Sequence, residues 1–391
     1  MLHDGAAILL QFYPLMPTIL INHGDIILKD RLLKGSSVLI EGTRIKSVGK
    51  ILRTKADIVI DARCCYVSPG FIDTHIHGDP ADIFPYEVKH GTTAIVVAVS
   101  CASLDEIFKT AQKIKTFMKE DRLGCEVLGF RLEGPYINIK KAGAQDKRYI
   151  RRPDKRELAL IIKRCTPALK MVTIAPELGG ALPLISLLSK KGIIPSIGHS
   201  YATAIQAIKG VEAGIRHATH FFNAMRLPAG KEGGVAGAVI SDGRIWAEVI
   251  LDRIHVPPAM FLLLLRAKGP GKVVLITDSV KACDQKGVRK FKGAYRFSDG
   301  KLAGSCLTMI KAVHNAVCCG LTLPEAVRLA SYNPAKMLGE HSRKGSIANG
   351  KDADILIFDK DFDVKLVLAR GKIMFQKKGA PIHVRYSGLH R

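Results

Sequence analysis

The sequence predicts an α/β protein, a (β/α)8 TIM barrel accompanied by a small β-sandwich that both chain ends build. Across the middle of the chain, strand-like apolar runs alternate eight times with helix-like stretches, which is typical of a parallel sheet. The two ends carry a different pattern, made of strands alone. The chain of 391 residues is long enough to bury one large core and a smaller second one.

Short strands separated by turn signals occupy both ends of the chain. Residues 18–62 hold apolar, β-branched runs with glycine and charged turns between them, and residues 345–375 repeat that pattern. An isolated hairpin is marginally stable in water, so we expect the two ends to pair into one domain. The predicted β-sandwich domain comprises residues 1–66 and 344–391, and the predicted barrel domain comprises residues 67–343.

Eight apolar runs are the expected barrel strands. They lie at residues 66–77, 92–100, 125–134, 170–177, 192–200, 217–224, 246–252 and 272–278. Stretches with helical periodicity lie between them, at residues 103–120, 154–166, 181–191 and 203–213. An open doubly wound sheet is the structural alternative, but no G-x-G-x-x-G turn follows a first strand to support it.

Charge and cysteine content limit the classes of partner. The 59 basic and 35 acidic residues give a net charge of +24, which favours an anionic partner. The basic residues are dispersed, without a long charged tail or an aromatic-interleaved array, so we expect a phosphorylated metabolite and no nucleic acid. The nine cysteines form no C-x-x-C pair, and no apolar run is long enough for a bilayer. These features predict a cytoplasmic protein with reduced thiols and no membrane association.

Metal-compatible side chains fall toward the C-terminal ends of five predicted strands. They are His75 and His77 on the first strand, Glu133 on the third, His199 on the fifth, His220 on the sixth and Asp278 on the eighth. Barrel active sites are built at this face from residues of several strands, so we expect these side chains to share one mouth. Imidazole and carboxylate ligands suit Zn²⁺, with Fe²⁺ or Mn²⁺ as alternatives, and open coordination positions would make the site catalytic.

Each of these residues also has a structural interpretation. A histidine on an apolar strand is usually a hydrogen-bonded core residue, but His75 and His77 point to the same face of their strand and can approach one ion. The two carboxylates could instead cap strand-to-loop turns. His217 is expected on the opposite face from His220 and is interpreted as structural. Glu177 is interpreted as a residue that supports the ligands.

A set of motifs in a fixed order carries a resemblance over nearly the whole chain. PGFIDTHIHG, RLEGPY, IGHS, THFFNAM, ITDS and LAGSCLTM resemble the N-acetylglucosamine-6-phosphate deacetylases of the amidohydrolase superfamily, as do NPAKMLG and KGSIANGKDADILIFD. The resemblance implies that Glu133, His199 and His220 bind the catalytic metal. It also implies that His75 and His77 allow a second metal, bridged by Glu133, so one or two ions are expected per subunit.

The resemblance further implies metal-assisted hydrolysis of an N-acetyl amide, with Asp278 as the catalytic proton shuttle. The expected substrate is N-acetylglucosamine-6-phosphate or a closely related N-acetylhexosamine phosphate, and the expected products are the amino sugar phosphate and acetate. A homodimer is expected. The implied substrate-binding residues are Gly143, Ala144, Gln145, Asn223, Ala224, Lys231, His255 and Leu307.

The sequence departs from the family pattern near the expected substrate. Lys231 stands in GKEGG where the family has the phosphate-binding arginine of GREPG, so the charge is kept but the guanidinium fork is lost. Arg253 replaces a glycine ahead of His255, and we interpret it as a surface residue. Gln145 takes the place of a histidine that polarises the acetyl carbonyl in several members. Only residues 78–89 separate HIH from HGTT, so the first crossover is shortened.

Two other functions fit parts of the sequence. A different amidohydrolase, such as a dihydroorotase, a D-aminoacylase or an adenine deaminase, would share the fold. Some of those enzymes bridge two metals with a lysine on the fourth strand, but the run KMVTIAPE has no lysine at its end. A non-catalytic scaffold that binds a sugar phosphate or a protein would not need every metal ligand together with Asp278, and bound metal would distinguish it from an enzyme.

Overall fold

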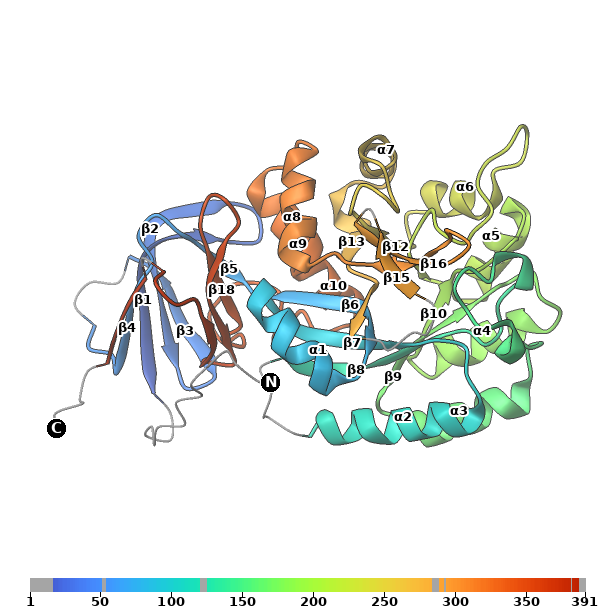
Figure 1. The fold of residues 1–391 in the computed structure, drawn as a ribbon, viewed down its shortest axis with the longest axis horizontal. Coiled ribbons are helices and arrows are strands. Elements are labelled where there is room, and N and C mark those ends of the chain that lie inside the picture. Colours follow the sequence, from blue (N-terminus) through green and yellow to red (C-terminus); the bar gives the residue numbers. More distant parts are fainter. Residues whose placement is uncertain are drawn as a thin grey trace.

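Two β-sheets, one from the middle of the chain and one from both ends, organise the fold (Figure 1). The computed structural model describes residues 17–50, 54–119, 125–282, 288–291, 293–380 and 382–386. One sheet has twelve strands and the other has nine. The predicted combination of a TIM-type barrel with a sheet domain from the chain ends is confirmed. Residues 1–16 and 387–391 of the predicted end domain lie outside the described residues.

Eight parallel strands form the barrel. They are β6 (Phe71–Gly78), β7 (Thr92–Val99), β8 (Glu126–Glu133), β9 (Leu169–Ile174), β10 (Ile194–Ile197), β11 (His217–Ala218), β12 (Trp246–Ile250) and β13 (Val273–Ile276). Each strand pairs in parallel with the next along this series. The strands are almost entirely buried, which explains why their sequences are continuous apolar runs without polar alternation.

The barrel closes just after β13, where the chain pairs with the first barrel strand. The strand β14 (Ser279–Ala282) pairs in parallel with β6. Ahead of it, the Asp278 N–H donates to the His75 carbonyl at 2.8 Å. The buried Asp73 carboxylate accepts from both the backbone N–H and the hydroxyl of Thr277. This junction brings the carboxyl-terminal ends of the first and eighth strands together.

Helices cover the outside of the barrel. The predicted ones are α2 (Leu104–Phe117), α3 (Lys155–Cys165), α4 (Ala181–Lys190) and α5 (Ala204–Ala213), while residue 120 of the first prediction lies outside the described residues. The others are α6 (Gly234–Ser241), α7 (Pro258–Lys268), α8 (Met309–Cys318), α9 (Leu323–Ala330) and α10 (Tyr332–Met337). Capping boxes at Ser103 and Thr203 fix where α2 and α5 begin, because each cap satisfies an otherwise unpaired backbone N–H.

Several predicted barrel strands are wrong in their extent, including the run at residues 192–200, where β10 covers only Ile194–Ile197. The run at residues 66–77 is two strands, because β5 (Tyr66–Pro69) pairs with strands of the end-built sheet and β6 begins after Gly70. A Cβ atom at Gly70 would lie 2.3 Å from the Thr93 hydroxyl, so only glycine fits where the chain passes between sheets. The run at 217–224 is also shorter than predicted, because β11 ends at Ala218 and His220 lies beyond it.

Two further segments differ from the regular barrel pattern, one as an added set of strands and one as a shortened crossover. An antiparallel extension that was not predicted follows β14, made of β15 (Val288–Phe291), β16 (Ala294–Phe297) and β17 (Leu302–Ser305). The shortened first crossover keeps the eight-residue helix α1 (Pro80–Glu87), which the Asp79 side chain caps by accepting from the Ala81 N–H. A three-residue 3-10 turn, η1 (Val88–His90), then leads into β7.

The second sheet contains strands from both ends of the chain, seen as blue and red ribbons lying together in Figure 1. The N-terminal strands are β1 (Thr18–Ile27), β2 (Leu32–Glu41), β3 (Arg44–Gly49), β4 (Ile58–Asp61) and β5. The C-terminal strands are β18 (Ile355–Phe358), β19 (Val364–Ala369), β20 (Lys372–Gln376) and β21 (His383–Tyr386). In β18, Ile355 and Ile357 enter the core of this sheet, whereas Leu356 and Phe358 enter the barrel core. This alternation packs the two sheets against one another.

The described residues contain neither a disulfide nor a membrane-length apolar helix. Eight of the nine cysteines lie in the described ranges, and all eight are free thiols. Within those ranges, no helix has both the length and the apolar character that a membrane crossing requires.

A buried ion cluster joins the start of β8 to the segment that precedes β18. The Lys344 Nζ atom lies 2.7 Å from Glu126, 2.5 Å from Asp354 and 3.3 Å from Asp352. The Arg343 guanidinium contacts both Glu126 oxygens, at 2.6 and 2.9 Å. Burial opposes the charge on Glu126, but Arg343 and Lys344 outweigh it and lower the pKa of Glu126 to about 2.

We expect Glu126→Gln to lower the free energy of unfolding at pH 7 and to weaken its acid dependence. A carboxylate with a depressed folded-state pKa stabilises the protein above its unfolded-state pKa, and this stabilisation is lost as pH falls toward the folded-state value. The shift corresponds to about 3 kcal/mol at neutral pH. In urea unfolding, the free energy of unfolding of the variant should be lower than that of the wild type at pH 7, and this difference should shrink to about half at pH 3. An equal deficit at both pH values would contradict the ion-cluster assignment.

Candidate metal centre

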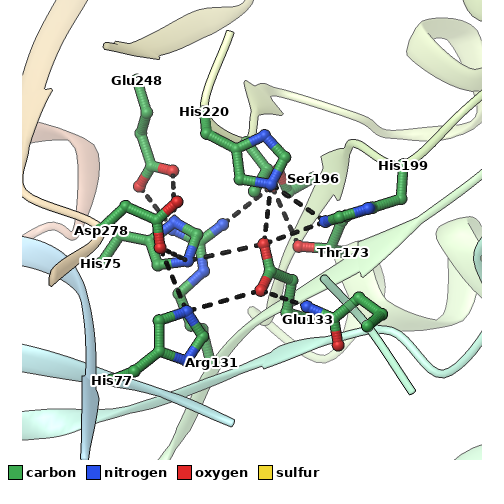
Figure 2. A network of polar contacts seen from close by, with 12 residues as sticks. His75, His77, Arg131, Glu133, Thr173, Ser196, His199, His220, Glu248 and Asp278 are labelled. Atoms are coloured by element: carbon green, nitrogen blue, oxygen red, sulfur yellow. Dashed lines mark hydrogen bonds and ion pairs between the residues drawn. The ribbon is translucent and has the colours of Figure 1, made fainter. Parts of the chain in front are cut away.

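All six side chains predicted as metal ligands or proton shuttle converge at the carboxyl-terminal ends of the barrel strands (Figure 2). They fall into two groups, and within each group the ligand atoms lie within 4.8 Å of one another. The first group is Glu133, His199 and His220, and the second is His75, His77 and Asp278. Five of the six residues are buried, and the Asp278 side chain is 14% exposed.

The first group has the spacing of a metal-ligand set. The Glu133 Oε1 atom lies 2.8 Å from His220 Nε2 and 3.1 Å from His199 Nε2, and the two ring nitrogens are 3.0 Å apart. A tetrahedral zinc ion with bonds of about 2.0–2.1 Å separates its ligand atoms by about 3.3 Å. The His199 Nδ1–H donates to the Lys141 carbonyl at 2.8 Å, which leaves the Nε2 lone pair facing Glu133. These residues fit a divalent cation.

The second group adjoins the first through Glu133. Asp278 Oδ1 lies 3.1 Å from His77 Nε2 and 3.4 Å from His75 Nε2. Glu133 Oε1 lies 3.5 Å from His75 Nε2, and its Oε2 lies 3.6 Å from His77 Nε2. The His75 Nε2 atom is buried and makes no hydrogen bond within the described residues, so a cation would satisfy it. The Glu133 carboxylate therefore lies between the two groups and contacts the histidines of both.

The loops that hold these side chains have strained backbones. The φ angle is +46° at His199, +30° at His220 and +47° at Asp278, and Phe222 and Ala224 are also left-handed. A non-glycine residue in this region costs on the order of 1–3 kcal/mol, and such residues cluster at functional sites. The strained backbones therefore indicate that the loops after β10, β11 and β13 form the functional face of the barrel.

The charges of the two groups stabilise one another. Burial opposes ionisation of Glu133, but the surrounding His75 and His199 side chains hold the pKa of that carboxyl well below its usual range. Burial also opposes ionisation of Asp278, and His75 and His77 outweigh it, so the Asp278 pKa is lowered. Both carboxyl groups are therefore ionised at neutral pH, the state in which they can bind a cation.

A buried ion pair that was not predicted lies beside the centre. Arg131 on β8 and Glu248 on β12 are fully buried, with Nη1 and Oε1 2.5 Å apart. Glu248 also contacts His75 Nδ1 at 3.4 Å and His217 Nε2 at 3.3 Å. His217 lies outside both ligand groups, but the expectation that it faces away from the site is wrong, because its ring points into the barrel against Glu248 and Ser196. The sequence could have indicated that Arg131 lies near the site, because it precedes Glu133 by two residues and so shares its face of the strand.

Glu177 supports the loop that carries His199. Its carboxylate accepts from the Ser200 hydroxyl at 2.7 Å, the Tyr201 N–H at 2.6 Å and the Asn138 side chain at 2.9 Å. These bonds hold the residues on either side of the ligand loop in place. Glu177 thus lies where the sequence interpretation put it, next to the ligands and outside their two groups.

Three residues predicted to bind substrate, Gly143, Ala144 and Gln145, lie in a loop beside the first ligand group. The Gln145 side chain donates to Glu133 Oε2 at 2.6 Å and accepts from the Cys101 N–H at 2.7 Å. In this structure the amide that was expected to face the acetyl carbonyl therefore contacts Glu133. Gly143 has a φ of +59°, and a Cβ atom there would lie 3.4 Å from His199 Cε1. The loop with Gly143 and the exposed Ala144 thus passes close to a ligand.

Three more predicted substrate-binding residues, Asn223, Ala224 and Leu307, lie on the loops after β11 and β17. The Asn223 N–H donates to the His220 carbonyl at 2.9 Å, so Asn223 and Ala224 continue the turn that holds that ligand. Leu307 is buried, and its N–H donates to the Ser305 hydroxyl at 3.0 Å.

The last two predicted substrate-binding residues are His255, which follows β12, and Lys231, which lies in a turn after β11. His255 Nδ1 lies 2.6 Å from Asp252 Oδ2, and this pairing fixes the ring orientation. Lys231 is exposed in a turn where Ala229 and Glu232 form a β-bridge. The Lys231 side chain is therefore accessible to solvent.

Comparisons with known proteins found similar chains over most of this sequence. The model of the Amidohydrolase family matches residues 66–374. An N-acetylglucosamine-6-phosphate deacetylase of Bacillus subtilis (strain 168) is 33% identical, covering 93% of this chain and 98% of that protein. An N-acetylgalactosamine-6-phosphate deacetylase of Escherichia coli O157:H7 is 32% identical over 78% of this chain and 86% of its own length. The crystal structure of N-acetylglucosamine-6-phosphate deacetylase from Pasteurella multocida superposes with a TM-score of 0.85 at 27% identity, over 92% of this chain and 100% of that one.

Proposed function

Because the chain belongs to the amidohydrolase family, we propose that it hydrolyses the acetamide of N-acetylglucosamine-6-phosphate or a closely related N-acetylhexosamine phosphate. The products are the amino sugar phosphate and acetate. The observation that carries the proposal is the convergence of Glu133, His199 and His220 on one point with Asp278 beside it. Amide hydrolysis needs a cation site next to a proton-transfer group, and these side chains supply both. The names of the relatives support the substrate class.

The family is metal-dependent, and we propose Zn²⁺ as the ion, with Fe²⁺ or Mn²⁺ as alternatives. Glu133, His199 and His220 would hold the first ion, and His75 and His77 would hold a second with Glu133 as the bridge. When bound, such a cation acidifies water and polarises the acetyl carbonyl. With only three protein ligands, the first group would leave room for water and substrate at a bound cation.

Asp278 would transfer the proton. Its carboxylate is ionised at neutral pH because His75 and His77 lower its pKa, so it can accept a proton from the attacking water. It would then deliver that proton to the departing amine. Its partial exposure leaves one side of the carboxylate open toward the mouth of the barrel.

Three positively charged side chains near the mouth of the barrel support the proposal of an anionic substrate. The Lys140 Nζ, Lys141 Nζ and Arg226 Cζ atoms lie 5.5, 5.7 and 5.0 Å from the centre of the Tyr201 ring. Within the described residues these three side chains form no ion pair with a carboxylate. The Lys141 backbone also holds the ring of His199, which links the cations to the metal centre. An unpaired positive group at this position would attract a phosphate.

We propose a homodimer in which Lys231 of one subunit reaches the phosphate bound in the other. The position of this lysine in an exposed turn supports such a reach. Its ammonium group would contribute charge to phosphate binding, with less directional control than a guanidinium fork.

Phosphate should control the rate on sugar substrates. We expect amine release from N-acetylglucosamine-6-phosphate or N-acetylgalactosamine-6-phosphate, with kcat/KM about 10²-fold lower on the unphosphorylated sugars. The reason is that hydrogen bonds to a charged group contribute about 1.5–3 kcal/mol. Assays on the four compounds measure this difference. Equal rates with and without phosphate would refute the phosphate-binding role of the cations, and no amine release from any of the four would refute the deacetylase proposal.

A further inference from the structure

The barrel interior beside the metal centre is polar, although such layers usually consist of branched apolar side chains. Figure 2 shows side chains from several strands meeting there. We refer to these residues as the interior layer, and all of them are fully buried: Thr74, Arg131, Thr173, Ser196, His217, Thr219 and Glu248. Hydroxyl groups link its members, as in the contact of 2.9 Å between Thr173 and Thr219.

The ion pair between Arg131 and Glu248 is the charged part of the interior layer. Arg131 Nη2 donates to the Thr219 hydroxyl at 2.8 Å, and the Thr74 hydroxyl donates to Glu248 Oε1 at 3.0 Å. Burying such a pair costs several kcal/mol per ion, and apolar residues of similar volume are often at least as stable. Stability alone therefore does not account for these charges, and a functional role is indicated.

The remaining oxygen of Glu248 faces a candidate metal ligand. Its Oε2 lies 3.4 Å from His75 Nδ1, while His75 Nε2, on the other side of the ring, faces Glu133 and Asp278 at 3.5 and 3.4 Å. Metal-binding histidines commonly donate their second ring N–H to a carboxylate or a carbonyl, which fixes the tautomer. A proton on Nδ1 directed at Glu248 leaves the Nε2 lone pair free for a cation.

In the first ligand group, a neutral backbone carbonyl fixes the histidine tautomer. His199 Nδ1 faces the Lys141 carbonyl at 2.8 Å, so its orientation does not involve Glu248. His75 in the second group relies on a buried carboxylate that is itself held by Arg131. Loss of the Glu248 charge should therefore act on the second group and spare the first.

We propose that Glu248, held in place by Arg131, is a positioning residue that orients His75 and thereby sets the affinity for the second cation. The inference rests on the proposed metal-dependent function. Glu248 is fully buried and contacts the ring of His75, so it acts through the tautomer of that histidine. The ligand concerned is a divalent cation of the Zn²⁺, Fe²⁺ or Mn²⁺ class, bound between His75, His77 and Glu133.

Glu248→Gln tests the inference because glutamine keeps the shape and can still accept from Arg131. The amide NH₂ would then face His75 Nδ1 and place the ring proton on Nε2, where it blocks the cation. Wild-type protein equilibrated with Zn²⁺ and dialysed should contain two ions per subunit by elemental analysis, and the variant should contain one. Calorimetric titration with Zn²⁺ should show the second site weakened about 10- to 100-fold and the first site unchanged.

Asp352→Asn is the matched control, because it also removes one buried carboxylate from an ion cluster, far from the ligands. It should retain two ions. If Glu248→Gln does not fold by circular dichroism, Thr74→Val removes only the hydroxyl donor to Glu248 and should weaken the second site a few-fold. Unchanged second-site affinity in the folded variant, or a wild type that binds only one ion, would overturn the inference and leave the deacetylase proposal standing. A wild type that binds no ion would instead refute the proposed function.

Discussion

Glu133→Gln should remove metal binding and turnover together. Glu133 contacts ligands of both groups, with Oε1 near His199 and His220 and Oε2 near His77. The substitution keeps the shape but removes the negative charge that balances the cations. Because a bound metal contributes several kcal/mol to the transition state, kcat/KM should fall at least about 10³-fold. Elemental analysis and amine release on the same sample measure both effects.

The control for this substitution is Glu126→Gln, which changes the same residue type at the opposite end of β8. It should keep its metal and most of its turnover, although it unfolds more easily. A Glu133→Gln protein with a full complement of metal and near-normal kcat/KM would show that Glu133 is not a ligand. The bridging arrangement would then be wrong as well.

Asp278→Asn should keep the metals and lose most of the turnover. Asparagine retains an oxygen at the position that faces His75 and His77, but it cannot accept a proton from water at neutral pH. General acid–base catalysis contributes about 10²- to 10⁴-fold, so kcat should fall by that amount with little change in KM. Steady-state kinetics together with metal analysis test this expectation.

Two outcomes would contradict the role of Asp278. A variant with near-normal kcat would show that another group transfers the proton. A variant that loses metal in proportion to its activity would show that Asp278 acts chiefly as a ligand of the second group. In that case the proton shuttle would have to be sought elsewhere at the mouth of the barrel.

The fold could be predicted because its periodic signals are strong. Barrel strands buried on both faces appear as apolar runs, and the strands of the chain ends alternate with clear turns. The split at Gly70 could not be predicted, because Tyr66–Pro69 and Phe71–Gly78 form one strand-like run that is shared by two sheets. The extension after β14 was also missed, because its short strands carry charged residues and no clean alternation.

The candidate ligand residues could be predicted because each lies near or just beyond the carboxyl-terminal end of a strand, and these ends of a barrel meet by geometry. Arg131 and Glu248 were missed because a single charge on an apolar strand gives no indication of its partner. Their pairing depends on which strands face each other across the barrel, which the three-dimensional arrangement settles. The contact between Gln145 and Glu133 likewise depends on a loop conformation that no local pattern encodes.

Metal-dependent deacetylation is tested most directly by reconstituting metal-free protein. The protein is stripped with a chelator, titrated with Zn²⁺, Fe²⁺ or Mn²⁺, and assayed for acetate release from N-acetylglucosamine-6-phosphate. We predict no release from the stripped protein, and a rise with added metal that saturates at one or two ions per subunit. Activity that survives complete removal of the metal, or no acetate release with any of the three ions, would contradict the proposed function.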